Sequence, residues 1–119
     1  MVTLPELVAE ARRLSELLDR GVAALRNAGV AYAAAEHEYR AAKAVAYLQT
    51  EGTVAEREAL TYAKVGELRH ARDAADATRV AALEAVRSRR TQLSALQSIL
   101  AAHRSEAEFD RTGPDVGRR

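Results

Sequence analysis

Apolar residues recur at heptad spacing from Leu4 to Gln49, and this pattern restricts the fold more than any other feature of the sequence. With Leu4 at an a position and Leu7 at a d position, twelve of the fourteen a and d positions are apolar. Because residues three and four apart share one face of a helix, the pattern predicts one long helix with a continuous seam. The fourteen positions are Leu4, Leu7, Ala11, Leu14, Leu18, Gly21, Leu25, Ala28, Tyr32, Ala35, Tyr39, Ala42, Ala46 and Gln49.

Alanine supplies much of the apolar content, since the 119 residues include 27 alanines, one phenylalanine and no tryptophan. Alanine has the highest helix propensity but buries little area, and apolar burial stabilises by roughly 25 cal/mol per Å². The two prolines, Pro5 and Pro114, lie near the ends, so no proline interrupts a helix between them. The composition therefore predicts an all-α fold of long, closely packed helices rather than a compact globule.

Two signals near residue 50 predict a turn. The stretch Thr50–Thr53 ("TEGT") interrupts the heptad pattern, and Thr53 with Glu56 matches a capping box at a helix start. A stop signal followed at once by a start signal is typical of an αα-hairpin. We therefore predict one helical hairpin over residues 1–112, with helices at about 4–49 and 54–109, a turn at 50–53, and a disordered basic tail at 113–119.

The second arm has a looser apolar stripe than the first. With a turn centred near residue 51 or 52, residue i of one arm should face about residue 103 − i of the other. The stretch Arg69–Arg79 is polar and rich in alanine, so we expect thin packing there. The stripe comprises Val65, Leu68, Ala75, Ala82, Leu83, Val86, Leu93, Leu96 and Leu100.

Several apolar residues of the first arm lie off its seam. A two-helix hairpin buries only one seam, so these residues need another surface to cover them. We therefore predict that the hairpin is a long antiparallel coiled coil that assembles into a homo-oligomer. The residues off the seam are Val8, Leu17, Val22, Val45 and Leu48.

Nothing in the sequence supports catalysis, a cofactor or a metal. Cysteine is absent, and Glu67 with His70 forms a single Glu-x-x-His motif, whereas a di-iron helical bundle needs two and two further glutamates. No segment has the roughly 20 apolar residues that span a bilayer, and the N-terminus lacks a signal-peptide pattern. We predict a non-enzymatic cytoplasmic protein that has no cofactor, metal or membrane partner.

Two groups of basic residues are candidates for binding phosphate. Arginines on a helix surface are usually solvated or paired with a carboxylate four residues away, as Arg40 could be with Glu36, and this interpretation is favoured for one hairpin. In an oligomer, symmetry would repeat each group and the phosphate contacts would add up. The first group is Arg12, Arg13, Arg87, Arg89 and Arg90, at the open end, and the second is Arg40 and Lys43 near the turn, with Arg57 and Lys64 on the facing arm.

The tyrosines have two alternative roles. Tyr32 and Tyr39 occupy a positions, which favours packing in the seam over stacking against nucleic-acid bases. Tyr47 lies beside the turn, and its position is compatible with either role.

Three stretches carry a resemblance to a known family. They are Glu38–Leu48 ("EYRAAKAVAYL"), Thr50–Glu58 ("TEGTVAERE") and Ala82–Arg89 ("ALEAVRSR"). In these the chain resembles UvsY-type recombination mediators, which are small coiled-coil proteins from the replication or recombination modules of tailed phages. The resemblance implies a ring-forming homo-oligomer in the host cytoplasm. It also implies single-stranded DNA, a recombinase and single-strand-binding protein as partners.

By position, the resemblance assigns DNA binding to Arg40 and Lys43 and to Arg87 and Arg89. The chain is richer in alanine and poorer in lysine than that family. The alternative is a structural or scaffolding hairpin that binds protein without nucleic acid. A secreted hairpin of the WXG type is a weaker alternative, because Tyr32 and Glu36 fit its tyrosine–acidic signal but no tryptophan is present.

Overall fold

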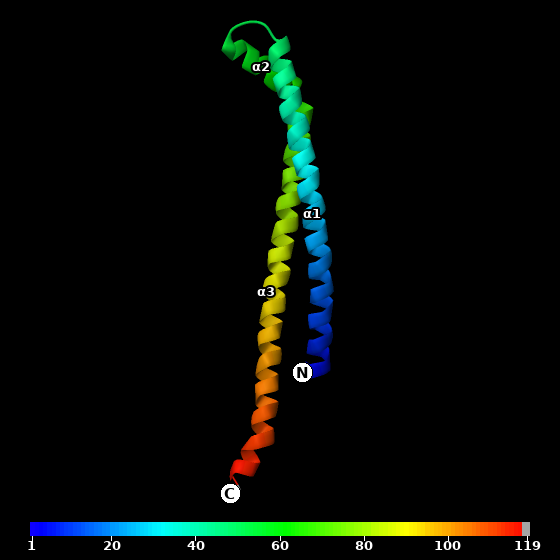
Figure 1. Cartoon of the computed structure of the whole chain (residues 1–119), viewed down its shortest axis with the longest axis vertical. Helices are drawn as coiled ribbons and strands as arrows, with labels where there is room; N and C mark the ends of the chain where they lie inside the picture. The colour runs from blue at the N-terminus through cyan, green and yellow to red at the C-terminus, as the bar shows by residue number, and fades with distance from the viewer. Residues whose placement is uncertain (118–119) are drawn as a thin grey trace. The chain divides into compact units, whose positions relative to one another are not determined.

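The computed structural model describes residues 1–117, with side chains for residues 1–111. The described residues form three helices, α1 (Leu4–Gln49), α2 (Val54–Lys64) and α3 (Gly66–Gly117), and no strand (Figure 1). The all-α helical hairpin is confirmed, and α1 has the predicted bounds. The chain divides into two compact units: unit 1 combines Met1–Gly21 with Ala85–Arg119, and unit 2 is Val22–Glu84.

The heptad seam of α1 is the face that the helix buries. Twelve of its fourteen predicted positions are buried or half-buried, and only Leu4 and Gln49 are exposed. Leu14 is buried in unit 1, and Tyr39 and Ala46 are buried in unit 2. In each unit this face of α1 packs against α3, so the spacing of apolar residues determines which side of the helix is covered.

The turn in unit 2 follows the predicted capping box. The Thr53 hydroxyl accepts a hydrogen bond of 3.2 Å from the Glu56 N–H, which starts α2. Thr50 is buried and donates its hydroxyl to the Ala46 carbonyl at 2.6 Å, so the end of α1 satisfies a carbonyl of its last turn. Gly52 has φ of 120°, a conformation that side chains rarely adopt.

The prediction of one unbroken second helix is wrong, because the chain leaves the helical path at Val65. Val65 has φ of −103° and ψ of 18°, and its side chain is buried with Tyr39 and Ala46. Burial of this side chain against α1 favours the break, and Gly66, a weak helix former, follows it. In unit 2, Figure 1 shows α2 set at an angle to the neighbouring ends of α1 and α3.

The predicted helix end near Phe109 is also wrong. α3 continues through Gly113 and Pro114 to Gly117, although every side chain of residues 101–111 is exposed. Helix hydrogen bonds are local, and the alanines and glutamates of this segment favour helix without a packing partner. Of the tail predicted as disordered (113–119), residues 118–119 lie outside the described residues.

The residues that lie opposite each other in the two arms are not the predicted ones. Under 103 − i, Tyr39 would face residue 64, but the Tyr39 ring faces Arg72, eight residues further along. In unit 1, Gly21 would face residue 82, but its nearest neighbour is Val86, four residues further along. The shift arises because α2 is separate from α3, so that pairing of the arms begins near Val65.

Two glycines give opposite stability predictions. No described atom outside the helical turn of Gly29 lies within 4 Å of the position that a Cβ would take, so Gly29→Ala should stabilise by about 1 kcal/mol. Gly52→Ala should destabilise by about 1–2 kcal/mol, because alanine disfavours positive φ and its Cβ would meet the Glu56 side chain. Urea unfolding followed by circular dichroism measures both, and changes of the same sign would contradict this account.

Candidate nucleic-acid interface

Arginines occupy core positions in the seam of α3, which sequence analysis missed. Continued from Val65 at heptad spacing, the seam includes Arg72, Arg79 and Arg89, and all three are half-buried. A strict heptad count from Val65 would have found them, but the polar, alanine-rich stretch Arg69–Arg79 was expected to pack only thinly. The complete seam is Val65, Leu68, Arg72, Ala75, Arg79, Ala82, Val86, Arg89, Leu93, Leu96 and Leu100.

In unit 2, two of these arginines cover the tyrosines of the α1 seam. The Arg72 guanidinium lies 4.4 Å from the Tyr39 ring centroid, and the Arg79 guanidinium lies 5.2 Å from that of Tyr32. Tyr39 is buried and Tyr32 half-buried, which confirms their predicted packing role. A cation over an aromatic ring contributes about 0.5–2 kcal/mol, so these stacks replace the apolar contacts that the alanines there cannot supply.

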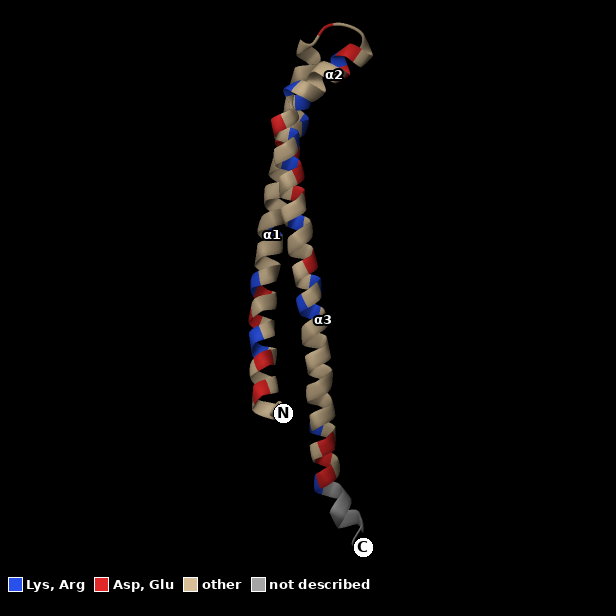
Figure 2. Ribbon diagram, turned by 180° about the vertical axis from the view of Figure 1, so that it is seen from behind, with Lys and Arg blue, Asp and Glu red and all other residues tan. Residues whose placement is uncertain are grey.

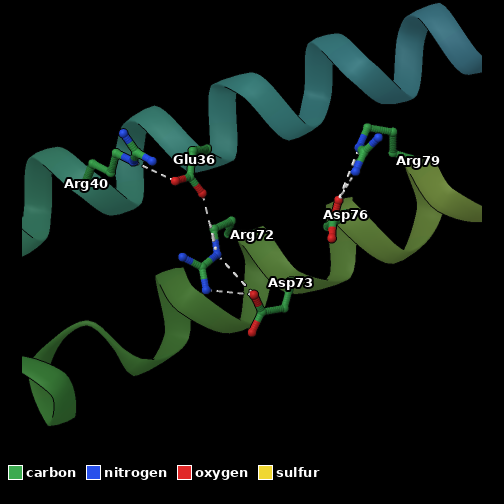
Figure 3. A network of polar contacts seen from close by, with 6 residues as sticks. All are labelled: Glu36, Arg40, Arg72, Asp73, Asp76 and Arg79. Atoms are coloured by element: carbon green, nitrogen blue, oxygen red, sulfur yellow. Dashed lines mark hydrogen bonds and ion pairs between the residues drawn. The ribbon is translucent and has the colours of Figure 1, made fainter.

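Carboxylates pair with the same two arginines and with Arg40 of α1 (Figure 3). Arg79 pairs with Asp76 at 2.6 Å. Glu36 accepts a hydrogen bond of 2.6 Å from Arg40 Nε, the predicted pair, and its other oxygen lies 3.6 Å from Arg72 Nε. Arg72 also donates to Asp73 at 2.9 and 3.0 Å, and this hydrogen bond raises the pKa of the Arg72 guanidinium above its ordinary value. Seam arginines that are paired in this way stabilise the hairpin and are poor candidates for binding phosphate.

The group predicted near the turn is present on one face of the last turns of α1. Arg40, Lys43 and Tyr47 line an open groove of about 440 Å³ together with Ala44 and Leu48. Their spacing of three and four residues places them side by side on the helix surface. Arg40 has 76% of its side chain exposed, and Lys43 forms no ion pair with the described residues. This groove, called the turn-end groove below, therefore combines positive charge with an aromatic ring.

Arg57 and Lys64, which were predicted on the arm facing this group, have different surroundings in unit 2. Arg57 lies with its guanidinium 4.0 Å from the Tyr47 ring centroid and donates to the Tyr47 carbonyl at 2.8 Å. Arg69 makes the equivalent pair with Tyr62, at 3.4 Å from the ring and 3.0 Å from its carbonyl. Lys64 lines a separate groove and not the one that Arg40 and Lys43 line.

In unit 1 the arginines of the open-end group lie at different levels from the predicted ones. Because Val86 lies beside Gly21, the level of Arg87 and Arg90 on α3 is offset from Arg12 and Arg13 on α1 by roughly one to two helical turns. Arg12, Arg87 and Arg90 are exposed, whereas Arg89 is half-buried in the seam. Figure 2 shows acidic residues interspersed with the basic ones along both helices.

Arg13 of that group is already paired. Its guanidinium forms two hydrogen bonds with the Glu10 carboxylate, one of them 2.9 Å long from Nε. These bonds lower the pKa of Glu10 and raise that of Arg13. The open end is therefore a weaker candidate for an anion site than the turn-end groove.

Among residues 1–117, no group of three or more potential metal ligands comes together, and no helix has the length and apolar content needed to cross a membrane. Comparison with known protein families, curated proteins and solved structures finds no match to the chain. The side chains of the described residues are therefore the basis for a functional proposal.

Proposed function

We propose that the protein is a non-enzymatic helical hairpin that binds single-stranded DNA through the turn-end groove of unit 2. The observation that carries the proposal is the joint placement of Arg40, Lys43 and Tyr47 on one exposed helix face. Cations that follow the backbone and aromatic rings that stack on bases are the two elements that bind single strands without sequence preference.

The electrostatics of the groove favour an anion. Lys43 has no carboxylate partner among the described residues, and Arg40 shares its exposed guanidinium with Glu36 alone. Arg57 adds a third cation on the ring of Tyr47, from α2. A phosphate backbone along α1 would thus meet the Lys43 ammonium, which no described carboxylate pairs with, beside the exposed guanidinium of Arg40, which Glu36 partly neutralises.

The resemblance to UvsY-type recombination mediators supports the same surface. Two of its three stretches, Glu38–Leu48 and Thr50–Glu58, form the turn end of unit 2. The fuller form of the proposal is a homo-oligomeric accessory protein that helps a recombinase to act on strands covered by single-strand-binding protein. In such an oligomer the groove is repeated by symmetry, and weak contacts become a continuous track.

A scaffolding hairpin that binds only protein is the second candidate. Apolar side chains are exposed near the turn, including Val45, Leu48 and Leu60, with exposed fractions of 53%, 79% and 50%. Such residues are typical of surfaces that bind protein, and they also fit contact with other copies of the hairpin.

Salt dependence of binding separates the two candidates. We expect a fluorescently labelled oligodeoxycytidylate of about 15 nucleotides to bind at low salt, with affinity falling steeply as salt rises, because each neutralised phosphate releases counterions. Fluorescence anisotropy at increasing sodium chloride measures this slope, and analytical ultracentrifugation of the same samples gives the mass of the complex. A protein that leaves the oligonucleotide unbound at low salt would support the scaffolding hairpin instead.

A further inference from the structure

Lys43 and Tyr47 of the turn-end groove also line a second space in unit 2. It is a cavity of about 310 Å³ between α1 and α2, within the size range of small-molecule sites. Thr61, of which 2% is exposed, lies in its wall. The full lining is Tyr39, Lys43, Tyr47, Glu58, Thr61 and Tyr62.

Three of the four tyrosines of the chain line this cavity, and an arginine stacks on each. Arg72 lies over Tyr39, Arg57 over Tyr47 and Arg69 over Tyr62, at 4.4, 4.0 and 3.4 Å from the ring centroids. None of these guanidinium groups is part of the cavity wall. The arginines therefore contact the rings from outside the cavity wall, whereas Lys43, which is in the wall, has its Nζ 5.9 Å from the Tyr39 ring centroid.

The charges around the cavity select the class of ligand. A cage of tyrosines would suit an organic cation, but Lys43 is in the wall and three guanidinium groups lie behind the rings. Glu58 is the only carboxylate in the wall of this cavity. This excess of positive charge disfavours a cationic ligand. It favours a ligand with a flat ring and a negative charge beside it, as a nucleotide has.

We propose that one base of the bound single strand enters this cavity and stacks on its tyrosines, while the adjoining phosphate lies at Lys43. This inference rests on the proposed function, because the turn-end groove brings the strand to the cavity mouth through the shared Lys43 and Tyr47. Glu58 accepts a hydrogen bond from an exocyclic amino group, so cytosine is favoured over thymine.

The test uses Tyr62→Leu, with Tyr32→Leu as the matched control. Tyr62 lines the cavity and is 62% exposed, so its loss should spare the fold, whereas Tyr32 lies outside the cavity wall and carries its own arginine. We expect Tyr62→Leu to weaken binding of an oligodeoxycytidylate by roughly tenfold with an unchanged salt slope, since stacking is lost but no phosphate contact. Tyr32→Leu should bind like the wild type.

A comparison with oligothymidylate is the second part of the test. Wild-type protein should bind oligodeoxycytidylate more tightly than oligothymidylate of equal length, and Glu58→Gln should reduce that preference. If the wild type binds DNA but Tyr62→Leu, with helicity retained, binds equally well, the cavity inference is overturned and the groove proposal stands. If the wild type binds neither oligonucleotide, both fail together.

Discussion

Val86→Asp is expected to lower the free energy of unfolding by about 3 kcal/mol or more, the largest stability change among the substitutions considered. Val86 is 2% exposed and lies in the seam of unit 1, where its Cγ2 is 3.4 Å from the Cβ position of Gly21. An aspartate there must either bury an unpaired carboxylate or force the two helices apart. Urea unfolding at one fixed protein concentration, followed by circular dichroism, measures the change.

Val80→Asp is the matched control for this substitution. It introduces the same residue into α3, but Val80 is 43% exposed, so the carboxylate stays hydrated and a change within about 0.5 kcal/mol is expected. Equal losses in the two variants would show that the seam does not stabilise the hairpin.

Reversal of both charges in the turn-end groove is expected to weaken DNA binding by about a hundredfold at low salt. Arg40→Glu with Lys43→Glu replaces the two cations that are proposed to bind phosphate by two anions on one exposed helix face. The helix should persist, because each new like-charge pair, such as the one that Arg40→Glu creates with Glu36, costs only about 0.5 kcal/mol. Fluorescence anisotropy with the labelled oligonucleotide gives the affinity, and circular dichroism checks helicity.

The control makes the same change in net charge at the open end. Arg12→Glu with Arg90→Glu alters two exposed arginines of unit 1 that the sequence analysis also assigned to phosphate binding. This variant should lose far less affinity, since Arg12 and Arg90 lie in unit 1 and do not line the turn-end groove, and the neighbouring Arg13 is paired with Glu10. A larger loss in the control than in the groove variant would move the binding surface to unit 1.

The helices of this chain were largely predictable because their signals are local. The α1 seam follows from heptad spacing, and the start of α2 follows from the Thr53 capping box, which depends on residues three apart. The break at Val65 was not predictable in this way. It depends on where the Val65 side chain packs against Tyr39 and Ala46, which is a tertiary contact.

The candidate site was predicted in part. Arg40, Lys43 and Tyr47 lie on a single helix, so their common face follows from spacing alone. Grouping of residues from two helices required the correct offset between arms, and the error of four residues in unit 1 misplaced the open-end arginines. The Tyr–Arg stacks depend on the same offset, and for that reason sequence analysis did not find them.

The paired tyrosines and arginines of unit 2 also determine how the two arms align. Tyr32 and Tyr39 are seven residues apart, as are Arg72 and Arg79, so sliding one arm by a heptad would leave one ring and one guanidinium without its counterpart. A zipper of alanines alone would tolerate such a slide, because each methyl group is interchangeable with the next. Each of the two cation–ring pairs thus favours the same alignment of the arms in unit 2, so that either pair alone still disfavours a slide by one heptad.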